Sequence, residues 1–144
     1  MIAVSSDHAG FSLLQEIIKH LEKSGIKYTN YGCADTTSCD YPDYAVPACR
    51  AVVSGGAEKA ILVCGTGIGM SMTANKIKGI RAAACSDYFS AKHTRLHNDA
   101  NVLCLGERVV GPGLAAELVD VFLQTGFEGG KHQRRVDKIT ALEE

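Results

Sequence analysis

Short apolar runs along the chain alternate with longer stretches in which apolar residues recur every three or four positions. The run at residues 60–64 is apolar throughout, as expected of a strand that is covered on both faces. Phe11, Leu14 and Leu21 belong to a helical pattern that ends at Gly25. These patterns predict strands at residues 2–5, 27–31, 60–64, 81–85 and 101–105, and helices at residues 10–22, 43–54, 67–77, 87–96, 111–125 and 132–142.

The strict alternation of strands and helices indicates an α/β fold, in which helices cover both faces of a parallel sheet. We expect a three-layer, doubly wound, Rossmann-like sheet of five parallel strands in the order 2-1-3-4-5, followed by a C-terminal helix. Ligands of such sheets bind beyond the carboxyl ends of the strands, where the winding direction switches. In this order the switch lies between the first and third strands, so the loops at residues 6–10 and 64–69 are the expected binding site.

Length and charge narrow the class of protein. The 144 residues favour a single domain, which we expect to span residues 1–144. A formal net charge of −1 provides no general attraction for nucleic acid or for an anionic membrane surface. The first residues do not resemble a signal peptide, and no apolar stretch approaches the roughly 18 residues of a membrane span. We therefore expect a cytoplasmic protein with neither a nucleic acid nor a membrane as its partner.

The six cysteines show no CxxC pair and no compact spacing, which argues against a disulfide framework and against a zinc site. Several of them lie inside apolar runs, where free cysteine behaves as a small buried hydrophobic residue. Five are interpreted as packing residues: Cys33, Cys39, Cys49, Cys85 and Cys104.

The loop at residues 64–69 has glycine at Gly65, Gly67 and Gly69, directly between a buried strand and a helix. Glycine lets the backbone approach a ligand closely, and the following helix directs free N–H groups at that place. The spacing is not GxGxxG, because Met70 stands where the third glycine belongs, and no Walker GK[ST] follows. A small anion such as an enediolate or a phosphate is therefore favoured over a nucleotide. A tight turn without a ligand is the alternative.

Cys64 ends the third expected strand beside this anion hole. The positive end of a helix favours a thiolate, which can act as a nucleophile or a general base. The alternative is an ordinary core cysteine at the end of a strand. Asp7 and His8 lie across the expected crevice, which favours chemistry, although Asp7 is also a typical cap for the first helix.

Two further polar clusters lie outside these loops. The segment from His93 to Asp99 has histidines four residues apart but no third metal ligand, so an exposed helix end is its default interpretation. It precedes the fifth strand and so lies at the amino edge of the sheet, where it would have to serve the site of a neighbouring subunit. Residues 131–135 hold three cations that suit a phosphate, although a solvated charged face is an equal alternative.

Taken together, the motifs resemble those of the type B ribose-5-phosphate isomerases, a family that includes isomerases of allose 6-phosphate and galactose 6-phosphate. The resemblance covers nearly the whole chain. The matching segments, in order, are Ser6-Asp7-His8-Ala9-Gly10, Asp40-Tyr41-Pro42, Cys64-Gly65-Thr66-Gly67-Ile68-Gly69, Ala74-Asn75-Lys76, His97-Asn98-Asp99-Ala100-Asn101, Gly106-Glu107-Arg108 and Glu128-Gly129-Gly130-Lys131-His132.

The resemblance implies an aldose–ketose isomerase in which Cys64 takes the proton from C2 of the opened sugar and returns it at C1, through a cis-enediolate. Thr66 and His97 match residues associated with ring opening, and Asp7 matches one that holds hydroxyl groups. The N–H groups from Gly65 to Gly69 would stabilise the oxyanion.

The resemblance also implies how the sugar phosphate is held. Tyr41 and Asn98 match residues that line the sugar, while His8, Arg108 and Arg135 match residues on the phosphate side. The family works as a homodimer whose active sites are shared between subunits, and we leave open whether dimers pair into tetramers. No metal and no organic cofactor is expected.

Lys131 departs from the family pattern, because members that prefer ribose 5-phosphate commonly carry arginine there. Lysine keeps the charge but loses the bidentate fork of arginine. Allose 6-phosphate or another hexose 6-phosphate therefore stays an alternative substrate. A non-catalytic sugar-phosphate-binding module is the alternative from another class, and a nucleotide-dependent oxidoreductase is disfavoured by the glycine spacing.

Overall fold

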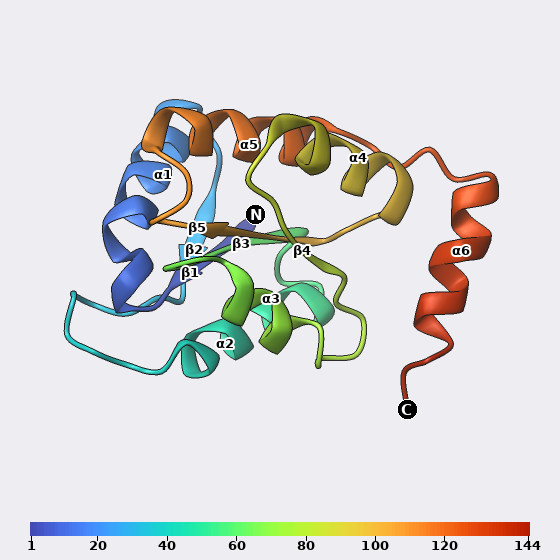
Figure 1. The fold of residues 1–144 in the computed structure, drawn as a ribbon, viewed down its shortest axis with the longest axis horizontal. Coiled ribbons are helices and arrows are strands. Elements are labelled where there is room, and N and C mark those ends of the chain that lie inside the picture. The colour runs from blue at the N-terminus through green and yellow to red at the C-terminus, as the bar shows by residue number, and fades with distance from the viewer.

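The computed structural model describes residues 1–144, and a five-stranded parallel sheet runs through its middle (Figure 1). The strands are β1 (Ile2–Ser6), β2 (Tyr28–Asn30), β3 (Lys59–Cys64), β4 (Ala82–Ala84) and β5 (Val102–Gly106). The helices are α1 (Phe11–Lys23), α2 (Tyr41–Val53), α3 (Ile68–Ala74), α4 (Tyr88–Asn98), α5 (Pro112–Gln124) and α6 (Lys131–Thr140), with a short 3-10 turn at His8–Gly10.

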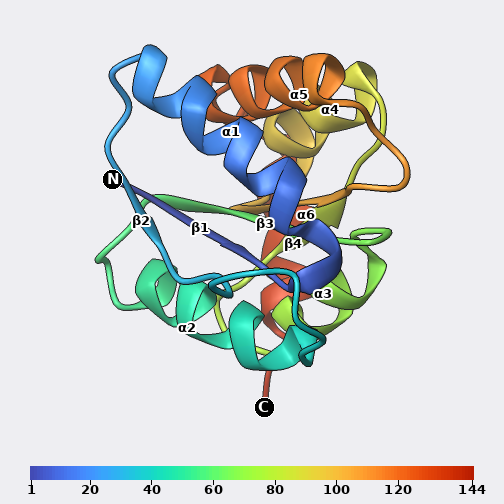
Figure 2. The ribbon, with the colours of Figure 1, turned by 90° about the vertical axis from the view of Figure 1, so that its left-hand side faces the viewer.

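Two apolar cores lie on the two faces of the sheet, which confirms the three-layer, doubly wound α/β fold. One core joins the sheet to α1, α4 and α5, and the other joins it to α2 and α3 (Figure 2). Strand β3 supplies both, because successive side chains point to opposite faces. Ile61 and Val63 enter the first core, whereas Leu62 and Cys64 enter the second, where Met70 of α3 also lies.

The order of the strands is β2-β1-β3-β5-β4, so the expected order 2-1-3-4-5 was wrong for the last two strands. Every residue of β5 is buried, whereas the three alanines of β4 are partly or fully exposed. An apolar strand gains most from a central place between two neighbours, and a short strand with small side chains is suited to an edge. The winding still switches between β1 and β3, as expected.

The remaining boundaries differ from the expectation only locally. Helix α3 ends at Ala74 instead of continuing to residue 77, because the side chain of Asn75 turns to bind the backbone of Ala82 through both its oxygen (2.8 Å) and its nitrogen (2.9 Å). This pair of hydrogen bonds holds β4 against the end of α3. No helix combines the length and the apolar character needed to cross a lipid bilayer.

Candidate active site

Cys64 lies at the carboxyl end of β3 and is only 4% exposed. Its Sγ accepts a hydrogen bond from the backbone N–H of Gly67, at 3.1 Å. Gly67 caps α3 with φ +80°, a left-handed conformation that glycine adopts without strain. The turn thus directs an N–H group at the sulfur, and such a donor stabilises a thiolate more than a thiol.

The glycine loop is closed by neighbours that approach it directly. A side chain at Gly69 would lie 2.7 Å from the ring of Tyr41, so this ring rests on the bare backbone of residue 69. A side chain at Gly106 would lie 2.6 Å from the backbone of Thr66, so β5 supports the loop from below. The guanidinium of Arg108 lies on Gly65, 3.5 Å from the position of a Cβ there.

Asp7 and His8 lie at the same edge of the sheet, in the turn that follows β1. The Oδ1 of Asp7 accepts the N–H of Gly10 at 3.0 Å, and the residue is 5% exposed. Asp7 is therefore the N-cap of the 3-10 turn that precedes α1, whereas the N-cap of α1 itself, the alternative role considered for Asp7, is Gly10. The Nδ1 of His8 accepts the N–H of Cys39 at 3.2 Å, so Nε2 carries the proton when the ring is neutral.

His97, Asn98, Lys131 and Arg135 make no contact with Cys64, Asp7 or His8 among the hydrogen bonds and ion pairs of the chain. The β3–α3 loop follows the central strand of the sheet, whereas the end of α4 lies near the edge strand β4 and α6 lies beyond it (Figure 1). Lys131 and Arg135 are exposed and make no ion pair. The structure therefore divides the predicted site residues into two groups, and a single chain does not bring them together.

Buried charges fix the end of α4. Arg95 is 7% exposed and donates to Asp99 (2.9 Å), to the carbonyl of Ala100 and to the carbonyl of Thr125, which follows α5. Arg81 binds the other oxygen of Asp99 at 3.1 Å. Arg95 and Asp99 are thus structural members of the segment in which His97 lies.

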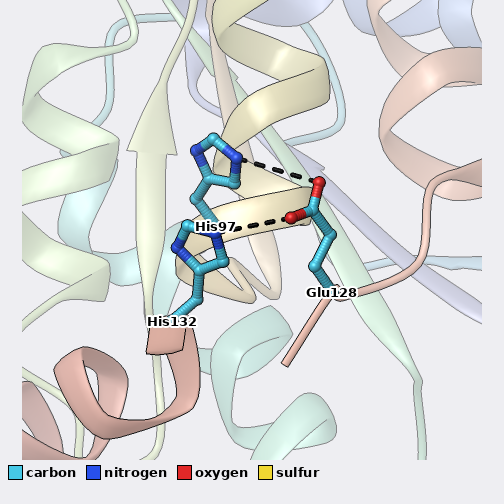
Figure 3. A group of neighbouring side chains, drawn as sticks. All are labelled: His97, Glu128 and His132. Carbon is cyan, nitrogen blue, oxygen red and sulfur yellow. Dashed lines mark ion pairs between the residues drawn. The ribbon is translucent and has the colours of Figure 1, made fainter. Parts of the chain in front are cut away.

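His97 has two neighbours that the sequence did not reveal. Its ring stacks on that of His132, with ring centres 4.1 Å apart, and both Nε2 atoms face the carboxylate of Glu128 (Figure 3). The sequence suggested no third ligand beside His93 and His97, because Glu128 and His132 belong to the last segment of the chain. The spacing of four residues between Glu128 and His132, across a turn at Gly129-Gly130, was the one available signal.

The other cysteines differ from Cys64 in their surroundings, and none is in a disulfide. Burial raises the pKa of the thiols of Cys49 and Cys85 to about 11 and raises that of Cys104 well above its ordinary value. Cys39 alone is only partly buried, so it fits the expected packing role least well.

We expect Cys49, Cys85 and Cys104 to resist iodoacetamide in the native protein at pH 8. With a pKa near 11 in place of 9, the thiolate fraction of Cys49 or Cys85 falls roughly a hundredfold. Mass spectrometry of peptides after timed labelling measures this, with protein in denaturant as the control in which all six cysteines react. Rapid native labelling of Cys104 would contradict the assignment.

Comparison with known proteins decides the family. The family model described as Ribose/Galactose Isomerase matches residues 2–139. The chain belongs to this family. Ribose-5-phosphate isomerase B of Escherichia coli (strain K12) is 48% identical, over 99% of this chain and 96% of its own length. The solved structure of ribose-5-phosphate isomerase B from Clostridium thermocellum superposes with a TM-score of 0.97 at 46% identity, covering 99% of this chain and 96% of the other.

Another relative in the family has a shorter substrate. The D-erythrulose-4-phosphate isomerase of Pectobacterium atrosepticum is 42% identical, over 96% of this chain and 91% of its own length. The chain is thus an enzyme, a sugar-phosphate isomerase, and the resemblance to the type B ribose-5-phosphate isomerases is confirmed.

Proposed function

We propose that the chain interconverts ribose 5-phosphate and ribulose 5-phosphate, with Cys64 as the base. The observation that carries this proposal is the hydrogen bond from Gly67 to Cys64 at the mouth of the glycine loop. The Cys64 thiolate removes the C2 proton of the opened aldose, and the electron pair moves to O1 as a cis-enediolate. The proton then returns at C1, and the proton on O2 passes to O1.

The loop from Gly65 to Gly69 stabilises the charge that forms on O1. Its backbone N–H groups precede or open α3, so the oxyanion lies at the positive end of the helix. Thr66 is exposed beside this place, with its hydroxyl already accepting from the N–H of Ile68 at 3.2 Å. One carboxylate oxygen of Asp7 already accepts the N–H of Gly10, so the other oxygen orients hydroxyl groups of the sugar. The ring of Tyr41 lies along the side of the sugar.

The second group of residues serves the site of a partner subunit in a homodimer. This inference rests on the separation of His97 and α6 from the glycine loop within one chain (Figure 1). A patch of exposed apolar side chains along the edge strand β4 supplies a surface for the partner. Ile68 and Val109 line a cavity of about 270 Å³ there, and Phe89 lines the adjoining one, which shares Ala84 and Cys85 with it.

Phosphate binding is divided in the same way. His8 and Arg108 lie at the edge that holds Cys64, whereas Lys131 and Arg135 lie one turn apart on α6 and approach from the partner. His97 and Asn98 reach the partner's site together with α6. Ring opening and phosphate binding therefore both need two chains. We infer further that residues 1–144 form one isomerase domain in the cytoplasm, and the six free cysteines support a reducing compartment.

A second substrate, allose 6-phosphate, is favoured by one observation. Lys131 is a single ammonium group where arginine would fix the phosphate through two parallel hydrogen bonds, so the phosphate can shift to accommodate a longer sugar.

The test is isomerisation in heavy water, with kcat/KM compared for ribose 5-phosphate and allose 6-phosphate. Proton transfer through Cys64 predicts deuterium at C1 of the ketose, whereas a hydride shift carries none from the solvent. We expect kcat/KM to favour ribose 5-phosphate by about tenfold or more, the discrimination typical of one extra carbon. A reversed ratio would make the hexose phosphate the substrate, and absence of any turnover would overturn the proposal.

A further inference from the structure

Three side chains from two segments meet at the end of α4: His97, Glu128 and His132. Glu128 Oε1 lies 3.9 Å from Nε2 of His97, and Oε2 lies 3.4 Å from Nε2 of His132. Each residue offers one ligand atom, and these three atoms lie within 4.8 Å of one another. Figure 3 shows both imidazoles turned toward the same carboxylate.

This combination of side chains suits a divalent transition-metal ion. Two imidazoles and one carboxylate form the ligand set of many zinc sites that keep a free coordination position. Ligands at 2.0–2.1 Å from a tetrahedral zinc ion stand about 3.3 Å apart. The separation of 3.4 Å already fits, but the separation of 3.9 Å is to the other carboxylate oxygen, and ligand atoms taken one from each residue spread over as much as 4.8 Å. The side chains must therefore move by about 1–1.5 Å to surround one ion.

Ring contacts, and not hydrogen bonds, restrain the two imidazoles: His97 stacks on His132 and has the ring of His93 edge-on to it, with centres 5.2 Å apart. The two imidazoles are stacked within 10° of parallel, so one of them must rotate before both Nε2 lone pairs can converge on one ion. Neither ring makes a hydrogen bond that opposes rotation: both lie only within ion-pair distance of Glu128. The His97 side chain is 41% exposed, which leaves it room to turn, whereas that of His132 is 13% exposed.

The backbone that carries the three residues is held in place. The N–H of Glu128 donates to the carbonyl of Leu96, directly before His97, at 3.0 Å. Arg95 ties the same turn of α4 to the end of α5. His132 is the second residue of α6 and follows Glu128 across the turn at Gly129-Gly130. The ligands therefore need only side-chain adjustments, which lowers the entropic cost of binding.

We propose that His97, Glu128 and His132 bind a divalent transition-metal ion, with Zn²⁺ and Co²⁺ as the probes, and that the bound ion inhibits the isomerase. The inhibition rests on the proposed function, because it takes His97 away from the substrate of the partner subunit. The binding does not, since it follows from the side chains alone. The ion thus inhibits the enzyme from a site at which the reaction itself uses no metal.

The binding test uses the full chain and Co²⁺ or Zn²⁺ in equilibrium dialysis. We expect one ion per chain, with affinity lowered about tenfold or more in Glu128→Gln and in His132→Gln. The matched control is His20→Gln, because His20 also pairs with a carboxylate, Asp120 at 2.7 Å, but has no second imidazole. Circular dichroism establishes that each variant is folded. Equal affinity in Glu128→Gln, His132→Gln and wild type would overturn the site.

Spectroscopy distinguishes the proposed site from binding of the ion by a cysteine. Cobalt bound by nitrogen and oxygen shows d–d absorption without the near-ultraviolet thiolate-to-cobalt band, so we expect that band to be absent. The spectrum should be the same in Cys64→Ala. A thiolate band that disappears in Cys64→Ala would place the ion on the sulfur and overturn the proposal.

The activity test is separate from the binding test. We expect Zn²⁺ to inhibit the wild type, a chelator to restore it, and the residual activity of His132→Gln to need about tenfold more Zn²⁺ for half inhibition. Saturable binding to the three residues without inhibition would overturn the inhibitory half of the proposal and remove His97 from the proposed reaction. Inhibition with unchanged zinc sensitivity in His132→Gln would place the inhibitory ion elsewhere.

Discussion

Replacement of Cys64 by alanine is expected to reduce kcat by about 10²–10⁴-fold, the usual contribution of general acid–base catalysis, and so to abolish measurable isomerisation. The change removes the only thiol that accepts an N–H of the glycine loop. It leaves β3 and its core intact, so we expect the free energy of unfolding to fall by about 1 kcal/mol. Steady-state kinetics and thermal unfolding measure the two effects.

The control for this prediction is Cys49→Ala. Cys49 is fully buried in the same core as Cys64, with its pKa raised to about 11, and has no place in the proposed reaction. Its removal should lower stability by a similar amount while kcat stays near the wild-type value. Retention of full activity in Cys64→Ala would remove this residue from the mechanism.

Mixed dimers are expected to recover activity that two inactive variants lack. Cys64→Ala and His97→Asn each damage both sites of a homodimer. In a dimer with one chain of each kind, one site has both defects and the other pairs an intact Cys64 with an intact His97. Random exchange of the two inactive proteins should therefore restore about one quarter of the wild-type activity, measured after unfolding and refolding together.

A site contained in one chain would give no recovery, because each chain would still lack one group.

The choice of substrate supplies a second control for His97. D-Erythrose 4-phosphate has its C4 hydroxyl esterified and forms no furanose ring, so it needs no ring opening. If His97→Asn acts on ring opening, it should impair ribose 5-phosphate far more than the tetrose phosphate. Equal losses on the two sugars would contradict that role.

The fold was largely predictable because the apolar pattern records burial directly. Strand β3 is apolar throughout and lies at the centre of the sheet, and the switch between β1 and β3 was placed correctly. The order of β4 and β5 was not predictable from alternation alone, because either order gives right-handed crossovers. The exposure of the alanines in β4 decides it, and that exposure depends on contacts between distant segments.

The candidate site was predictable only in part. The loop from Cys64 to Gly69 follows from local spacing, and topology alone placed His97 at the edge opposite to it. Glu128 and His132 were missed as partners of His97, because their contact depends on how the last helix returns to α4. Residues of the matched motifs also proved structural: the Asn75 side chain holds β4, and the carboxylate of Glu107 accepts the N–H of Leu13 at 2.7 Å.

The contacts at Gly69 and Gly106 determine where this enzyme can change its substrate. In the site that we propose, main chain forms the floor under the reacting carbons, and an added methyl group at either position would collide with a ring or with a peptide unit. Substitution therefore cannot reshape the floor without displacing its supports. On this proposal, selection or engineering for a longer or shorter sugar acts on the walls of the site. We place there Tyr41, whose ring lies against Gly69, and Lys131, which is exposed on α6. Chemistry and specificity can in this way change independently of each other.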